Sequence, residues 1–262
     1  MLESVTDAMI IDATVPGASV RFYAPTTQLI TRAQTLLRKE PDTIAWIDQF
    51  DEGDVLWDIG ANVGVFGLYA AVRKQCKVLA FEPSAANYYV LSRNIELNHL
   101  ADRMTAYCIA FADETRAGVL NLASHSLGTS LNQFGELGET SRYWSQSTPA
   151  VVQGMIGFSI DDFMHQFNPP FPTHIKIDVD GIESAILRGA RRTLSDPRLR
   201  SVLVELDVDS PEEGSDGRLC LEEAGFRLAG RGELQGTESA HAANHLFERI
   251  ARPTAKQPIG NT

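Results

Sequence analysis

Short apolar runs alternate with helix-like segments along most of this 262-residue chain, and this alternation restricts the possible folds more than any other feature. The runs are rich in Val, Ile and Leu, as strands buried on both faces should be. They are Val55–Trp57, Val78–Phe81, Met104–Ile109, Ile175–Val179 and Val202–Leu206. The predicted helices between them are Val63–Arg73, Ala85–Asn98 and Ile182–Leu194. Strand–helix alternation favours parallel pairing with right-handed crossovers, so the sequence predicts an α/β, Rossmann-like, doubly wound sheet.

The N-terminal part of the chain departs from this rhythm. Residues 1–50 are amphipathic, with an alternating stretch around Val20 and Phe22 and a helix predicted near Leu29–Leu37. We interpret them as a cap that packs on a main domain spanning residues 51–252.

The C-terminal part also departs from it. A helix is predicted near Arg218–Ala224, followed by strands at Phe226–Ala229 and His245–Ile250, which are close enough in sequence to form a hairpin. Residues 253–262 are polar and contain two prolines, so we predict a disordered tail.

Residues 124–149 do not fit the alternating scheme. They are crowded with Gly, Ser and Thr but include Phe134, Tyr143 and Trp144. A loop of this length in a compact domain is usually functional or disordered. We predict a lid over the acceptor site, with the alternative that the aromatic side chains pack the loop onto the core.

The composition excludes several classes of protein. The 23 basic and 34 acidic side chains leave a formal charge of −11, which argues against a nucleic-acid partner. The three cysteines lack CxxC spacing, which indicates reduced thiols and neither a disulfide framework nor a zinc site. The N-terminus has acids where a signal peptide needs bases, and no apolar run is long enough to span a bilayer. We therefore expect a cytoplasmic protein, with a homo-oligomer possible.

The densest chemical signal follows the first core run. Asp58 ends the predicted strand, and Gly60, Asn62 and Gly64 form a tight loop before a helix. In open α/β sheets, ligands bind beyond the carboxyl ends of the strands, where such a loop lets backbone approach them closely. The helix N-terminus beyond the loop favours an anionic group. The loop therefore predicts a cofactor site.

Two cofactor classes compete for this loop. A dinucleotide fingerprint would require glycine at positions 62 and 65, where the chain has Asn62 and Val65. The G-x-[GN]-x-G spacing suits an S-adenosylmethionine loop better. Asp58 also favours that cofactor, because a carboxylate attracts an ammonium or sulfonium group and repels a pyrophosphate.

A second acid strengthens this interpretation. Glu82 ends the next predicted strand, 82 − 58 = 24 residues after Asp58, where a carboxylate can accept hydrogen bonds from both ribose hydroxyls. Pro83 and Ser84 then begin a helix, with Ser84 as its predicted cap, and we include both among the predicted cofactor-binding residues.

A third group of charges lies at the Ile175–Val179 run. Strand alternation places Lys176, Asp178 and Asp180 on one side of the chain. Asp178 is our first candidate for the general base, with the alternative that it binds the cofactor by holding the methionine ammonium group. Glu205 is the second candidate, and His125 and His241 are weaker ones. Lys176 is assigned to the catalytic group, with the alternative that it only neutralises Asp58 or Glu205. The acids could hold a divalent ion, but no His–acid cluster supports one, so we predict no metal site.

The segments DIGANVG (58–64), AFEPS (80–84), IKIDVDGIE (175–183) and ANHLF (243–247) occur in order. Together they make the chain resemble the FkbM-type family of S-adenosylmethionine-dependent methyltransferases. The resemblance implies a class I fold with seven strands, the last of them antiparallel. It also implies O-methylation of hydroxyl groups on sugars, glycans or natural products.

The resemblance further assigns site residues. Asp58, Gly60, Asn62 and Gly64 match the loop on the methionine side, and Glu82 matches the ribose-binding acid. Ala110 and Asp113 match the family segment near the adenine, although Ala112 stands where the family has glycine, and Asp180 replaces a glutamate of the family pattern. Two alternatives remain: an NAD(P)-dependent oxidoreductase and an inactive methyltransferase-like binding module.

Overall fold

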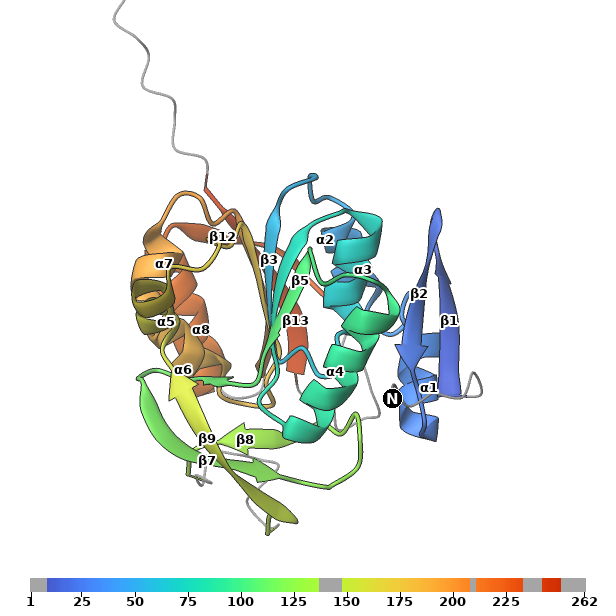
Figure 1. Ribbon diagram of the computed structural model, residues 1–262. Coiled ribbons are helices and arrows are strands. Elements are labelled where there is room, and N and C mark those ends of the chain that lie inside the picture. The colour runs from blue at the N-terminus through green and yellow to red at the C-terminus, as the bar shows by residue number, and fades with distance from the viewer. Residues whose placement is uncertain (1–8, 137–147, 208–210, 233–241, 251–262) are drawn as a thin grey trace, which may run out of the picture.

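The computed structural model describes residues 9–136, 148–207, 211–232 and 242–250, and Figure 1 shows their arrangement. A seven-stranded sheet forms the centre, in the order β12-β13-β11-β10-β3-β4-β5. Its strands are β3 Val55–Ile59, β4 Lys77–Phe81, β5 Met104–Tyr107, β10 His174–Ile177, β11 Ser201–Asp207, β12 Phe226–Arg231 and β13 Ala242–Arg249. The β3, β4, β5, β10 and β11 pairings are parallel, and β13 runs antiparallel to both of its neighbours. The predicted α/β fold with an antiparallel last strand is confirmed.

Helices cover both faces of the sheet (Figure 1). They are α3 Val65–Arg73 and α4 Ala85–Leu97 on one face, and α5 Ile160–Phe167, α6 Glu183–Arg188, α7 Arg191–Ser195 and α8 Pro211–Glu223 on the other. Alternate strand residues face opposite cores: Leu56 and Leu203 belong to one buried cluster, Trp57 and Val202 to the other. Polar residues at the strand ends therefore also divide between the two faces.

The N-terminal residues pack on the α3–α4 face of the sheet. The hairpin β1 Ile10–Val15 and β2 Ala18–Tyr23 precedes α1 Thr27–Gln34 and α2 Pro41–Ile47. Backbone amides of Arg21 and Tyr23 donate to the side-chain oxygens of Asn98 and Asn94 on α4, at 2.8 and 2.7 Å. The sequence predicted the alternating stretch that forms β2 and the helix α1. It missed α2, which has a proline in its first turn. Among the described helices, none is long and apolar enough to cross a membrane.

A second sheet was not predicted. Its strands are β6 Ala110–Phe111, β7 Arg116–Leu122, β8 Asn132–Phe134 and β9 Val151–Phe158, in the order β6-β9-β7-β8. It lies across one end of the central sheet, below it in Figure 1. Part of the predicted 124–149 loop is thus strand β8, and Phe134 is buried against the β7 and β9 glycines. Tyr143 and Trp144 lie outside the described residues.

The predicted helix Ile182–Leu194 is in fact two helices. α6 ends at Arg188 and α7 begins at Arg191. A Cβ on Gly189 would lie 2.4 Å from the Ala112 carbonyl oxygen, so the backbone approaches another segment closely at the break. The Gly189 carbonyl accepts from the Asp161 amide at 3.0 Å, which replaces a bond that a continuous helix would make.

Candidate active site

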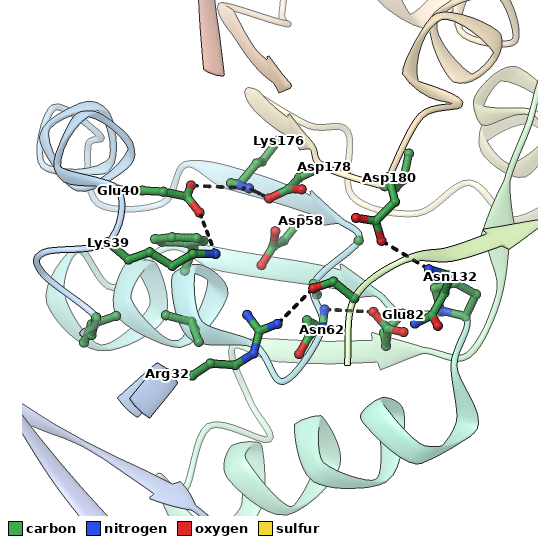
Figure 2. A pocket seen from close by; sticks show the side chains of 18 of the residues that line it. Arg32, Lys39, Glu40, Asp58, Asn62, Glu82, Asn132, Lys176, Asp178 and Asp180 are labelled. Atoms are coloured by element: carbon green, nitrogen blue, oxygen red, sulfur yellow. Dashed lines mark hydrogen bonds and ion pairs between the residues drawn. The ribbon is translucent and has the colours of Figure 1, made fainter. Parts of the chain in front are cut away.

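A crevice opens at the carboxyl ends of β3, β4 and β10 (Figure 2). It holds about 850 Å³ of atom-free space, including its open mouth. The glycine loop, the end of β10, the segment before β8 and the α1–α2 region all contribute to its wall. Asp58 and Glu82 both line it, so the two acids singled out in the sequence share one crevice.

The glycine loop adopts left-handed backbone at three positions. Gly60, Asn62 and Gly64 have φ of 82°, 50° and 88°. A Cβ on Gly60 would lie 1.9 Å from the Asp178 carbonyl oxygen, which leaves room for glycine alone between β3 and β10. The Gly60 and Ala61 amides donate to the Phe81 carbonyl at 2.9 and 3.0 Å, which fixes the loop against β4. Gly64 is the N-cap of α3 and does not line the crevice.

Asp58 is the last acid of β3 before the loop. Its carboxylate accepts from the Gly67 amide of α3 at 3.1 Å. Burial raises the pKa of Asp58 to about 6, against the opposing charge of Lys176, which is its partner residue on β10. Asp58 is therefore half protonated near pH 6 and carries its full charge only well above that pH.

Glu82 follows β4 and is 4% exposed. Its Oε2 accepts from the Asn62 amide at 2.8 Å, and its Oε1 accepts from the Ser84 amide at 2.9 Å and from Asn87 Nδ2 at 3.5 Å. Burial raises the pKa of Glu82 to about 7. Ser84 is the N-cap of α4 as predicted, but its side chain makes no capping bond, and Glu82 accepts from its backbone instead. Pro83 lines the crevice.

Lys176 and Asp178 form an ion pair at the end of β10. Lys176 Nζ lies 2.6 Å from Asp178 Oδ2 and 3.8 Å from Glu40 Oε2. Burial acts to lower the pKa of Lys176, but the charges of Asp178, Glu40 and Asp58 outweigh it, so the pKa is raised. Burial acts to raise the pKa of Asp178, but Lys176 holds it below its usual value. Both side chains therefore stay charged at neutral pH.

Asp180 joins β10 to the second sheet. Its backbone is left-handed (φ 63°), and its Oδ2 accepts from the Leu131 and Asn132 amides at 2.6 and 3.2 Å. Burial raises the pKa of Asp180 to about 6. The sequence predicted that Lys176, Asp178 and Asp180 lie on one side of the chain, and all three line the crevice.

Glu205, our second candidate for the base, is on β11 and is not among the residues that line the crevice. The charge of Asp178 and burial together raise the pKa of Glu205 well above its usual value. The negative charge of Asp178 therefore favours the protonated form of Glu205. His125 is exposed and away from the crevice, and His241 lies outside the described residues.

The segment 128–132, which we call the strap, closes one side of the crevice. The Gly128 carbonyl accepts from Gln28 Nε2 at 2.8 Å and from the Nε and Nη2 atoms of Arg32 at 3.0 and 2.8 Å. The Thr129 carbonyl accepts from Asn62 Nδ2 and Asn87 Nδ2 at 3.2 and 3.0 Å. The strap therefore ties α1 to the glycine loop and to α4.

An apolar slot adjoins the crevice and shares Gly60, Pro83, Asn132 and Val179 with it. Its other walls are apolar side chains of both sheets and of the β10–α6 connection: Ile59, Phe81, Ile109, Ala110, Phe111, Leu120, Phe134 and Ile182. The structure thus places Ala110 in the slot. It places Asp113 outside both cavities, in a partly exposed ion pair with Arg188 at 3.8 Å.

Sequence reasoning missed the part of the wall that comes from α1 and the residues after it. Arg32, Lys39 and Glu40 all line the crevice. Glu40, with 7% exposure, is a buried acid just before Pro41. The sequence itself shows only an acidic residue directly before a proline that can begin a helix, which does not indicate burial. Among the described side chains, no group of three or more His, Cys, Asp or Glu residues is arranged to hold a metal ion.

Known proteins share this fold. One is the magnesium protoporphyrin IX methyltransferase ChlM from Synechocystis PCC 6803, which was solved with bound SAM. Its TM-score is 0.50 at 11% sequence identity, and the match covers 86% of this chain and 85% of the ChlM chain. A methyltransferase FkbM from Methylobacillus flagellatus KT has a TM-score of 0.51 at 18% identity, covering 76% of this chain but only 44% of its own. At these identities, the likeness shows the fold alone.

Sequence comparison adds the family. The hexuronic acid methyltransferase AglP of Haloferax volcanii is 27% identical over 198 residues, which are 75% of each chain. The methyltransferase FkbM domain matches residues 58–228, a span that contains the glycine loop, Glu82 and the β10 charges. This match extends over more than half of the sequence, and the chain therefore belongs to the FkbM family of methyltransferases.

Proposed function

We propose that this methyltransferase uses S-adenosylmethionine to methylate a hydroxyl group of a sugar, glycan or natural product. The observation that carries the proposal is the excess of acid in the crevice: among the described residues, five carboxylates and three cations line it. The carboxylates are those of Glu40, Asp58, Glu82, Asp178 and Asp180. Such a wall attracts a sulfonium compound and repels the pyrophosphate of a nicotinamide dinucleotide.

The residues fit a nucleoside at one end of the crevice. The apolar slot suits a planar base, and Glu82 stands at the junction of the slot and the crevice beside Pro83. Donors from the described residues take three of the four lone-pair positions of the Glu82 carboxylate, two on Oε1 and one on Oε2. One position on Oε2 is left for a ribose hydroxyl. Asp113 lies outside both cavities, so its location does not support a contact with the adenine.

When bound, S-adenosylmethionine supplies an electrophilic methyl group on a positively charged sulfur. The chain must then align an acceptor hydroxyl and accept its proton. Asp178 is our candidate for this role, because it lines the crevice and Lys176 keeps it ionised. Lys176 acts as a positioning residue that holds Asp178 by a 2.6 Å ion pair. The raised pKa of Glu205 argues against the same role for it.

The acceptor class rests on the relatives. AglP is named a hexuronic acid methyltransferase, which supports a carbohydrate acceptor for this chain. The family match and the acidic wall both weigh against the NAD(P)-dependent oxidoreductase. An inactive binding module would be expected to have lost the loop or the acids, and both are present.

Isothermal titration tests the cofactor. S-adenosylhomocysteine should bind at micromolar concentration and NAD should not, and the reverse result would contradict the proposal. Mass spectrometry of a glycan and natural-product panel incubated with labelled methyl donor then tests the acceptor class. A methylated amine or carboxylate in place of a hydroxyl would contradict the O-methylation.

The role of Asp178 is tested by the variant Asp178→Asn. It should lower turnover by about 100-fold, because an amide cannot accept the hydroxyl proton. The affinity for S-adenosylhomocysteine should change much less. Equal losses in turnover and affinity would show that Asp178 binds cofactor and does not act as the base.

A further inference from the structure

The α1–α2 corner, by which we mean Arg32, Lys39 and Glu40, is a charged part of the crevice wall to which the proposed function gives no specific contact. It belongs to the N-terminal residues, which lie outside the matched family domain at 58–228. Figure 2 shows Lys39 and Glu40 on the same side of the crevice as Lys176, and Glu82 on the other. The corner therefore faces the end of the crevice away from the base slot.

Glu40 has one anchored oxygen and one open oxygen. Its Oε2 accepts from Thr43 Oγ1 at 2.9 Å and from Asn244 Nδ2 at 3.1 Å, and lies 3.8 Å from Lys176 Nζ. Its Oε1 meets Lys39 Nζ at 3.7 Å, which is too long for a hydrogen bond. The carboxylate is thus held rigidly from β13 and α2 while one oxygen keeps its capacity to accept a hydrogen bond.

Lys39 supplies the opposite charge at the same place. Its side chain is 55% exposed and reaches into the crevice beside Glu40 (Figure 2). Arg32 adds positive charge nearby, although the strap already takes its Nε and Nη2 atoms. A cation and a carboxylate therefore stand next to each other with bonding capacity left on both.

Adjacent charges of opposite sign match one chemical group in particular. The α-ammonium and α-carboxylate of an amino acid sit on a single carbon, and each needs a partner of the opposite charge. We propose that Glu40 binds the ammonium and Lys39 the carboxylate of the methionine tail of the cofactor. This inference rests on the proposed use of S-adenosylmethionine. It makes the N-terminal cap part of the cofactor site and leaves Asp178 for the acceptor hydroxyl.

The test compares two ligands that differ only in the tail. S-adenosylhomocysteine carries the amino-acid tail, and 5′-methylthioadenosine has the same nucleoside and a thioether without it. Glu40→Gln and Lys39→Ala should each weaken S-adenosylhomocysteine binding by about tenfold or more, as expected for a hydrogen bond to a charged group. The affinity for 5′-methylthioadenosine should change less than about twofold. Titration calorimetry measures both affinities for the parent and for each of the two variants.

Matched controls lie next to the tested residues. Arg38→Ala removes an exposed cation adjacent to Lys39, and Asp42→Asn removes an exposed acid near Glu40, and neither residue lines the crevice. Both controls should bind both ligands as the parent does. Thermal melting of each variant separates loss of binding from loss of folding.

The outcomes are distinct. Equal losses for both ligands would assign Glu40 and Lys39 a purely structural role and overturn the inference. Unchanged S-adenosylhomocysteine affinity in both variants would also overturn it and would leave the corner to the acceptor. If the parent binds 5′-methylthioadenosine as tightly as S-adenosylhomocysteine, the tail has no site here, although the nucleoside proposal stands. If the parent binds neither ligand, the proposed cofactor itself is wrong.

Discussion

The central sheet buries charged groups along two edges: the amino edge, where its parallel strands begin, and the carboxyl edge, where they end. The two edges do so in opposite ways. At the amino edge, His174 lies between Ser201 Oγ at 2.7 Å and Asp54 Oδ2 at 3.1 Å, and Trp46 Nε1 donates to Ser201 at 2.9 Å. Arg200 forms an ion pair with Asp54. Neither Asp54, His174 nor Ser201 lines the crevice or the apolar slot.

At the carboxyl edge, acids outnumber their partners. In the part of the chain that the structure describes, five carboxylates face three cations around an open crevice, and oxygens of Glu40 and Glu82 keep unused bonding capacity. A serine, a histidine and an aspartate in contact at the amino edge could suggest a hydrolase triad. However, the three side chains are buried and bonded to one another, and none of them lines either of the two cavities described above. Burial of charge alone therefore does not mark a functional site, and surplus charge beside a cavity does.

The largest expected contrast between the edges comes from two glycines. Gly53 before β3 and Gly60 after it both have left-handed backbone, with φ of 88° and 82°. An added Cβ would meet nothing within 4 Å at Gly53 but the Asp178 carbonyl at 1.9 Å at Gly60. Gly53→Ala should cost about 1–2 kcal/mol of unfolding free energy, and Gly60→Ala more than about 4 kcal/mol. Urea unfolding measures both, and similar costs would refute the close approach of β3 and β10.

Acid should act on the two edges with opposite sign. Burial lowers the pKa of His174 to about 4, so the unfolded chain binds a proton first as the pH falls below about 6.5. The contribution of neutral His174 to stability is present above pH 6.5 and is lost between about 6.5 and 4, up to about 3 kcal/mol. The acids Asp58, Glu82 and Asp180 have raised pKa values, so acidification favours their folded form.

The variant His174→Gln isolates the amino edge. The difference in unfolding free energy between the parent and this variant should shrink as the pH falls from 7 to 4, because only the parent loses the histidine contribution. Both proteins keep the same acids at the carboxyl edge. A difference that is constant with pH would contradict the assignment of a buried neutral imidazole.

Removing one acid from each edge should separate binding from stability. Glu82→Ala should weaken S-adenosylhomocysteine binding by roughly 1.5–3 kcal/mol, as for hydrogen bonds to a charged group. Asp54→Ala should lower the unfolding free energy by about 1–3 kcal/mol and leave the affinity of the folded protein unchanged. Calorimetry and urea unfolding on both variants check this. Loss of affinity in Asp54→Ala alone would reverse the roles we assign to the edges.

Much of the carboxyl edge could be predicted because its signals are local. The spacing of Asp58, Gly60 and Glu82 follows from strands that end beside one another in a parallel sheet, and the structure places Asp58 and Glu82 in one crevice. Glu40 and the strap could not be predicted in the same way. Their places depend on how the N-terminal residues and the second sheet pack on the central sheet, with partners as far apart as Glu40 and Asn244.

The smallest expected effect concerns Asp113, which the family resemblance put near the adenine. The structure places it in a partly exposed pair with Arg188, 3.8 Å away and outside both cavities. Exposed pairs contribute roughly 0–1 kcal/mol, so Asp113→Ala should change the unfolding free energy by less than about 1 kcal/mol and kcat/KM by less than about twofold. Ala110, which does line the slot, gives the contrast: a bulky replacement such as Ala110→Leu should fill the slot and weaken S-adenosylhomocysteine binding measured by calorimetry. If Asp113→Ala weakens binding more than Ala110→Leu does, the adenine lies outside the slot. Asp113 would then lie near the adenine, as the family resemblance implies.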